Sequence, residues 1–153
     1  MMEFSMELPD EPGQLARVTE ALSTANINIL TICAIGRVAP NVALVTEHVP
    51  QTRTVLDELG IEYIASPLLS MVMPDEAGSL AKFSRRLADA GVNINSIYIL
   101  SKHRGDAELV FSVDDVDKAR QTLNLHESVP PRTIEGRVWT YANWLSRRAR
   151  LIW

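Results

Sequence analysis

The chain repeats itself after 65 residues, and this repeat constrains its fold more than any other feature. Residues 9–30 read PDEPGQLARVTEALSTANINIL, and residues 74–95 read PDEAGSLAKFSRRLADAGVNIN. An acid and a glycine precede a predicted helix in both copies, and an asparagine follows it. The identical pairs include Pro9/Pro74, Asp10/Asp75, Glu11/Glu76, Gly13/Gly78, Leu15/Leu80 and Asn28/Asn93. Repetition at domain-length spacing predicts two copies of one folding unit.

Each copy begins with the pattern of a strand followed by a helix. EFSMEL (3–8) alternates apolar and polar residues, as does a half-buried strand, and LLSMVM (68–73) takes its place in the second copy. Apolar residues then recur at helical spacing. Pro12 fits the first helical turn, where its missing N–H costs nothing. The helices should end at Asn26 and Gly91, because Asn and Gly tolerate the left-handed C-cap conformation.

The rest of each copy completes a β-α-β-β-α-β order. β-branched residues mark strands in 27–36 and 92–100, with partner strands in 41–49 and 106–113. Second helices are predicted over 51–60 and over 114–123, where Asp114 and Asp115 suit a helix start. Last strands are predicted over 61–66 and, more weakly, over LNLHES (123–128). The fold class is therefore α+β: two tandem ferredoxin-like units, each a four-stranded antiparallel sheet with helices on one face.

The pattern D-E-x-G-x-L, an amphipathic helix and then A-[NG]-[IV]-N-I resembles the ACT domain family, whose members are small regulatory modules that bind amino acids. The resemblance extends over residues 1 to about 127 as two tandem copies. It implies a ligand at an interface between two ACT units, near the loop that joins the first strand to the first helix. It also implies that a polar residue at the start of the second strand holds the ligand.

The residues that match those family positions are the predicted ligand-binding residues. They are Asp10, Glu11, Pro12, Gly13, Gln14, Leu15 and Asn28 in the first copy, and Asp75, Glu76, Ala77, Gly78, Ser79, Leu80 and Asn93 in the second. The physics agrees with this placement. Free N–H groups at a helix start attract a carboxylate, glycine permits close approach, and a nearby carboxylate receives an ammonium group.

Plainer interpretations of the same residues stay open at this point. Asp10 and Asp75 also suit helix caps, or positions at the positive end of the helix dipole. Gly13 and Gly78 also suit a turn, and Asn28 and Asn93 also suit strand edges. The copies differ at several positions, so the two sites need not bind the same ligand.

Composition and motifs argue against several other functions. No apolar run approaches the roughly 20 residues needed to span a bilayer, and the acidic N-terminus indicates no secretory signal. Residues 1–127 hold 10 Lys and Arg against 18 Asp and Glu, which argues against a nucleic-acid surface. The sequence shows no nucleotide-binding or nucleophile motif. His48, His103 and His126 match no zinc spacing. We expect no catalytic residues, no metal and no cofactor.

The tail differs from the body of the chain. We place the first ACT unit at residues 1–66, the second at 67–127, and a basic, Trp- and Arg-rich tail at 128–153, which holds all three Trp residues. NWLSRRARLIW (143–153) has the pattern of a short basic amphipathic helix. A non-native origin is the alternative, because IEGR (134–137) resembles a protease-site linker and out-of-frame translation gives such compositions.

The sequence thus predicts a cytoplasmic, non-enzymatic regulatory protein that binds an amino acid between ACT units. Cys33 is the only cysteine, which fits a reducing compartment. These units expose sheet edges, which are often paired side by side in the family that the chain resembles. We therefore expect the two copies to associate closely and two chains to form a homodimer. The alternative is a structural module of the same fold that docks an unidentified protein partner and binds no amino acid.

Overall fold

A computed structural model describes residues 1–36, 41–125, 133–134 and 137–138. The fold is mixed α+β with antiparallel sheets and βαββαβ-like units, as predicted. The N-terminal unit comprises β1 (Met2–Glu7), α1 (Gln14–Thr24), β2 (Ile29–Ile35), β3 (Asn41–Thr46), α2 (Val49–Glu58) and β4 (Tyr63–Pro67). The C-terminal unit comprises β5 (Leu69–Pro74), α3 (Ser79–Asp89), β6 (Ile94–His103), β7 (Asp106–Val113) and α4 (Val116–Leu123).

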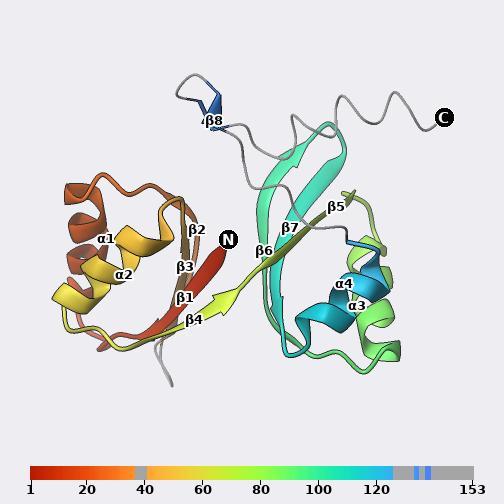
Figure 1. Ribbon diagram of the computed structural model, residues 1–153, viewed down its shortest axis with the longest axis horizontal. Coiled ribbons are helices and arrows are strands. Elements are labelled where there is room, and N and C mark those ends of the chain that lie inside the picture. The colour runs from red at the N-terminus through yellow and green to blue at the C-terminus, as the bar shows by residue number, and fades with distance from the viewer. Residues whose placement is uncertain (37–40, 126–132, 135–136, 139–153) are drawn as a thin grey trace.

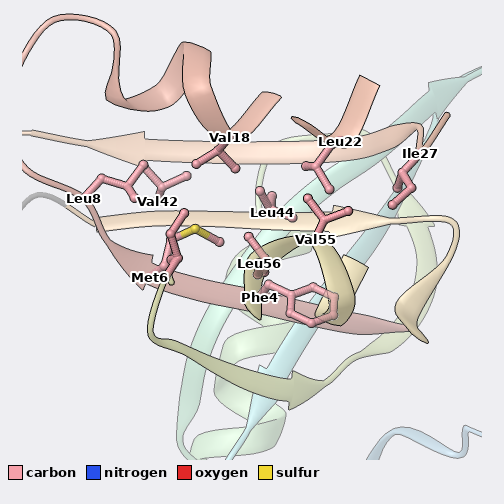
Figure 2. Packing of buried hydrophobic residues seen from close by; sticks show 11 residues of the cluster. Phe4, Met6, Leu8, Val18, Leu22, Ile27, Val42, Leu44, Val55 and Leu56 are labelled. Atoms are coloured by element: carbon pink, nitrogen blue, oxygen red, sulfur yellow. The ribbon is translucent and has the colours of Figure 1, made fainter. Parts of the chain in front are cut away.

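The N-terminal unit is a four-stranded sheet in the order β2-β3-β1-β4, with α1 and α2 on one face. Alternate residues of β1 and β3 point toward the helices, which is why EFSMEL alternates. Figure 2 shows Phe4, Leu44, Val18 and Leu56 meeting between the sheet and the helices, and all four are fully buried. Inside this unit Thr46 and Thr52 share a buried hydrogen bond of 2.6 Å, which ties β3 to α2.

The C-terminal unit repeats this plan with one strand fewer among its described residues. Its sheet has the order β5-β7-β6, and Phe83 packs edge-on against Phe111 at 5.0 Å between ring centroids. The start of the predicted last strand is wrong, because Leu123 is the last residue of α4 and Leu125 lies outside any strand. Residues 126–128 of that prediction lie outside the described residues.

The helix ends follow the sequence signals closely, and the helix starts do so less well. Asn26 (φ 55°) and Gly91 (φ 67°) are left-handed residues just after α1 and α3, as predicted. Asp115 caps α4 by accepting a 3.0 Å hydrogen bond from the amide of Lys118. The placement of Pro12 in the first turn of α1 is wrong. Gly13 is the N-cap residue, so Pro12 lies in the preceding loop.

The two units pack sheet to sheet through the faces that carry no helices. Figure 1 shows α1 and α2 on one outer side, α3 and α4 on the other, and the two sheets between them. Val45 of β3 and Val110 of β7 are fully buried in a cluster with Leu68, which connects β4 to β5. Leu30, Tyr98 and Leu100 pack around it. The core between the sheets is therefore a third apolar cluster, separate from the core of either unit.

A buried polar contact also joins the two sheets. Glu3 on β1 is only 5% exposed, and its carboxylate accepts a hydrogen bond from the hydroxyl of Ser96 on β6. Ser96 is also hydrogen-bonded to Ser112 on β7 at 2.6 Å. A buried carboxylate without a partner would be costly. This contact therefore favours one relative placement of the two sheets.

Two short strands of the tail are described: β8 (Thr133–Ile134) and β9 (Arg137–Val138), which form an antiparallel pair. The predicted amphipathic helix over 143–153 lies outside the described residues. No helix in the described part of the chain is long and apolar enough to cross a membrane.

The packing of the two sheets predicts a large stability cost for Val110→Ala. Removing buried methyl groups from the inter-sheet core should lower the free energy of unfolding by about 2 kcal/mol, because both burial and packing are lost. Urea denaturation followed by circular dichroism measures this change. Ile64→Ala is the control, because Ile64 is 71% exposed and should change stability by less than about 0.5 kcal/mol. Equal effects of the two variants would contradict face-to-face packing.

Candidate functional site

The strand-to-helix loops of the two units have the same backbone geometry. Gly13 has φ 95° and ψ −14°, and Gly78 has φ 94° and ψ −15°, and each is the N-cap residue of the helix that follows. The carbonyls of Gly13 and Gly78 accept hydrogen bonds from the backbone amides of Arg17 and Lys82, both at 2.9 Å. A Cβ at either glycine would find nothing within 4 Å. The need for glycine therefore comes from the backbone conformation, which L-residues rarely adopt.

No side chain caps the helix that follows either loop. Neither α1 nor α3 has a side-chain hydrogen bond at its cap, unlike α4 with Asp115. The interpretation of Asp10 and Asp75 as helix caps is therefore wrong. The positive end of each helix dipole faces an exposed loop without a bound carboxylate from the described part of the chain.

The two aspartates have different surroundings. Asp75 forms an exposed ion pair with Lys102 on β6 at 3.0 Å, and its amide donates to the carbonyl of Gly105 at 2.7 Å. Asp10 is exposed and lies near Gly36, which follows β2. Its Oδ1 would be 3.8 Å from the Cβ of an alanine at position 36. Lys102 was not identified from the sequence. The signal for it was present, because Arg37 stands 65 residues before Lys102 in the repeat.

The predicted asparagines lie at the opposite end of each sheet from the loops. The loop after β1 begins where Glu7 pairs with Asn41, the first residue of β3. Asn28 lies at the other end of β3, where its carbonyl accepts a hydrogen bond from the backbone amide of Glu47. Six residues of β3 separate these ends, a distance of about 17 Å. The C-terminal unit has the same arrangement: Asp106 pairs with Pro74, while Asn93 lies beside Asp114. Neither unit by itself brings its loop and its asparagine together.

Each asparagine makes a local polar contact. Asn28 donates from Nδ2 to Glu47 Oε1 at 3.3 Å, and Asn93 donates from Nδ2 to Asn95 Oδ1 at 3.0 Å. Asn28 also lines a surface hollow of about 500 Å³. The sequence did not point to this hollow, whose other polar lining residues are Thr19, Ser23, Asn26, Glu47 and His48.

A second hollow, of about 300 Å³, lies in the C-terminal unit and includes two predicted site residues. Glu76 and Ser79 line it, together with Met71 and Met73 of β5 and Phe83 of α3. Apart from the partly buried Gln14 and the buried Ser79, the predicted site side chains are exposed. No group of three or more His, Cys, Asp or Glu residues within the described ranges is placed to hold a metal ion.

Exposed apolar residues recur at matching positions of the two units. Leu15, in the first turn of α1, is 39% exposed, and its repeat counterpart Leu80 is 53% exposed. Ile32 on β2 pairs with Leu44, so its side chain is on the helix face of the sheet, yet it is 42% exposed at the sheet edge. Its counterpart Ile97 on β6 is 36% exposed. The repeat has thus kept the same uncovered apolar positions in both units.

The buried polar contact between the sheets perturbs one titratable group. Burial raises the pKa of Tyr98, and the neighbouring Glu3 carboxylate raises it further through hydrogen bonding and charge. The folded protein therefore favours the neutral phenol. Cys33 on β2 is another neighbour with a small effect in the same direction.

These observations define a small α+β module whose exposed strand-to-helix loops each end in a left-handed glycine. Residues 68–130 match the family model of the ACT domain. This match extends from the start of β5 past the end of α4.

Solved structures share the fold across most of the chain. A protein from Bacteroides thetaiotaomicron superposes with a TM-score of 0.71 at 22% identity, over 80% of this chain and 85% of that one. The ligand-free regulatory subunit of aspartate kinase from Thermus thermophilus gives 0.60 at 17% identity, over 83% and 92%. The corresponding subunit from Thermus flavus gives 0.59 at 19% identity, over 80% and 90%. No curated protein matches the sequence.

The loop geometry predicts that Gly13→Ala and Gly78→Ala each lower stability by about 1–2 kcal/mol, because an L-residue at this positive φ is strained. Nothing crowds the added methyl group, so the cost comes from the backbone alone. Thermal unfolding measures the loss. Gly13→Asn and Gly78→Asn should lose less, since Asn accepts positive φ more readily. A loss as large for Asn as for Ala would argue against this cause.

Tyr98 predicts a loss of stability at alkaline pH. The pKa of Tyr98 is raised in the folded state, so the folded protein holds the phenol proton more tightly than the unfolded chain does. The contribution of Tyr98 to the free energy of unfolding is therefore fully present below the unfolded pKa of about 10 and is lost as pH rises above that value. Denaturant unfolding on both sides of pH 10 measures this effect. Tyr98→Phe should flatten the difference, because it removes the ionisable hydroxyl. An identical pH profile in wild type and Tyr98→Phe would refute the prediction.

Proposed function

We propose that this chain is a non-catalytic regulatory protein that binds an amino acid at an interface between ACT units. Both units act as ACT units in this proposal, arranged in tandem, with boundaries at residues 66 and 127. One observation carries it: the same uncapped helix start behind a left-handed glycine occurs in both units. The family match over residues 68–130 and the shared fold of two aspartate kinase regulatory subunits support it.

The chemistry of the loops suits an α-amino acid. The amides of Gln14 and Ser79 donate to the carbonyls of Glu11 and Glu76. The remaining amides of the first helical turn bind the carboxylate, with help from the positive end of the helix dipole. In the C-terminal unit Lys102 adds a second positive charge beside the loop. The ligand's ammonium group competes with Lys102 for Asp75. That competition is weak, because an exposed ion pair contributes only about 0–1 kcal/mol.

The geometry of each unit supports a site at an interface. Loop and asparagine are about 17 Å apart in the N-terminal unit, too far for one amino acid to contact both. A second unit placed alongside in the opposite direction brings its asparagine to the loop of the first. The exposed apolar residues of the first helical turns and of the edge strands, Leu15 and Ile32 in one unit and Leu80 and Ile97 in the other, supply surface that such contact buries.

A regulatory effect follows if the ligand binds one arrangement of units better than another. Binding then shifts the equilibrium between arrangements by the difference in affinity, as allostery requires. The protein acts in the cytoplasm as a homodimer in this proposal. It uses no cofactor and no metal, and its output passes to a partner protein.

Isothermal titration of the full chain with each of the twenty amino acids tests the proposal. We expect one or a few amino acids to bind with micromolar to millimolar affinity. Gly13→Ala/Gly78→Ala should lose this binding, because the added strain displaces the first-turn amides. Each single variant shows which loop binds.

Gly60→Ala is the matched control. Gly60 also has a positive φ of 66°, and a Cβ there also meets nothing within 4 Å, but it follows α2 away from both loops. It should lose stability and keep binding. If no amino acid binds the full chain, the protein is a partner-docking module in which the two motifs serve only as turns.

A further inference from the structure

The hollow of about 500 Å³ lies at the end of the N-terminal unit that is away from the strand-to-helix loop. Three segments line it: the second half of α1, the residues that lead into β2, and Glu47 and His48 between β3 and α2. The buried Ile27 belongs to the core of this unit (Figure 2), and most of the lining residues around it are polar. Apart from Asn28, these residues have no part in the proposed amino-acid site.

Backbone hydrogen bonds identify the corresponding place in the C-terminal unit. The amide of Glu47 donates to the carbonyl of Asn28 at 3.2 Å, and the amide of Asp114 donates to the carbonyl of Asn93, also at 3.2 Å. Asp114 therefore corresponds to Glu47. The Asp114 carboxylate accepts from the backbone amide of Asn93 at 2.9 Å, whereas the longer Glu47 reaches the side-chain amide of Asn28 at 3.3 Å and lines the hollow.

The C-terminal unit places a lysine ammonium group at the end of its own first helix. Asp115 and His48 are the N-cap residues of α4 and α2, so Lys118 and Gln51 occupy the same place, three residues after each N-cap. Lys118 Nζ would lie 3.9 Å from a Cβ at Gly91, the left-handed residue that follows α3. A cation is favourable there, because the C-terminal end of a helix carries the negative pole of its dipole.

The N-terminal unit has the negative groups of this place without that lysine. Asn26 is the left-handed residue after α1, as Gly91 is after α3, and it lines the hollow. Gln51 is uncharged, so α2 supplies no ammonium group to the negative pole of α1 or to the partly buried Glu47. Residues 1–66 hold three Arg and no Lys against nine Asp and Glu, so the field of this unit also attracts cations.

We propose that this hollow binds a small aliphatic amine, whose ammonium group takes the place that Lys118 Nζ has in the C-terminal unit. A volume of about 500 Å³ is within the range of small-molecule sites. An ammonium group has three N–H donors and no acceptor, so it needs a site rich in acceptor oxygens. Such oxygens line the hollow on Glu47, Asn26, Asn28 and Ser23.

The same groups select the charge of the ligand. A carboxylate or phosphate would meet the like charge of Glu47, and a neutral alcohol would gain little from the negative pole of α1. Ile29 is partly buried at the wall of the hollow and offers an apolar surface to the stem of the amine. Because the charges are only partly shielded from water, the amine binds with a Kd in the millimolar range.

A ¹H–¹⁵N NMR titration of the full chain tests the proposal. The probe is n-butylamine hydrochloride, which has the stem and ammonium group of a lysine side chain, at constant pH and ionic strength. Its uncharged counterpart is 1-butanol. We expect butylamine, and not butanol, to give saturable shifts of the backbone amides of Asn26, Asn28 and Glu47. No saturable shift with butylamine, or an equal response to 1-butanol, overturns the proposal.

Two variants locate the bound amine. Glu47→Gln should weaken binding at least about fivefold, because it removes the charge and keeps the shape. Gln51→Lys should weaken it as much by placing the chain's own ammonium group in the hollow, and it decides the matter if Glu47→Gln does not fold. Glu62→Gln is the matched control and should bind as wild type, because Glu62 is exposed beside Tyr63, which pairs with Met6 near the loop end of the sheet. Unchanged binding in Glu47→Gln or Gln51→Lys overturns the proposal.

Amine binding is separable from amino-acid binding at the loops. Gly13→Ala/Gly78→Ala should bind butylamine as wild type does, because the hollow lies at the other end of the sheet. Loss of butylamine binding in this folded double variant would place the ammonium group at the loops and overturn the proposal.

Discussion

The structure depends on the burial of one sheet face against another. Each unit covers only one face of its sheet with helices, and the other face carries residues such as Val45 and Val110 that cannot remain in water without cost. Because the two units cover these faces for each other, the inter-sheet core involves both halves of the repeat. The buried Glu3–Ser96 contact restricts the relative position of the two sheet faces. A different placement would leave the buried Glu3 carboxylate without its hydrogen-bond partner. The outer loops and sheet edges are then the places left for recognition.

Most local structure was predictable because its signals are local. Helix periodicity, the left-handed Asn26 and Gly91, and the Asp115 cap all act within a few residues, and the structure confirms them. The errors arose where distant contacts decide. Pro12 suits a first helical turn, but Gly13 caps the helix and shifts its start. The aspartates suit helix caps, yet Asp75 pairs with Lys102 from a distant strand. The sheet-to-sheet contact was not predictable, because Glu3 and Ser112 alternate with apolar residues as solvent-facing residues do.

The candidate site shows the same division between local and distant information. The geometry of the Gly13 and Gly78 loops follows from short motifs, and the structure gives both the same left-handed conformation. The distance of Asn28 and Asn93 from the loops does not follow from the motifs themselves. Each helix runs back along the whole length of the sheet before the chain reaches the asparagine. Sequence proximity across a helix therefore places two residues at opposite ends of a unit. A ligand that contacts both a loop and an asparagine therefore requires two units. The exposed Leu15 and Leu80, in the first turns of the helices after the loops, lie where a second unit would then make contact.

The two copies of the repeat differ in the sheet that their described residues form. The N-terminal unit closes the edge of β1 with β4 and places Tyr63 over Phe4, so its core is covered on all sides that a single unit can supply. Within the described residues, the C-terminal unit has a shorter second helix, eight residues against ten, and its β5 pairs with β7 alone. The inter-sheet core reaches this unit through Leu68, which directly precedes β5. The strand that begins the C-terminal sheet therefore adjoins the residue that anchors the two units to each other, so a substitution at Leu68 acts on the inter-sheet core and on the start of β5 together.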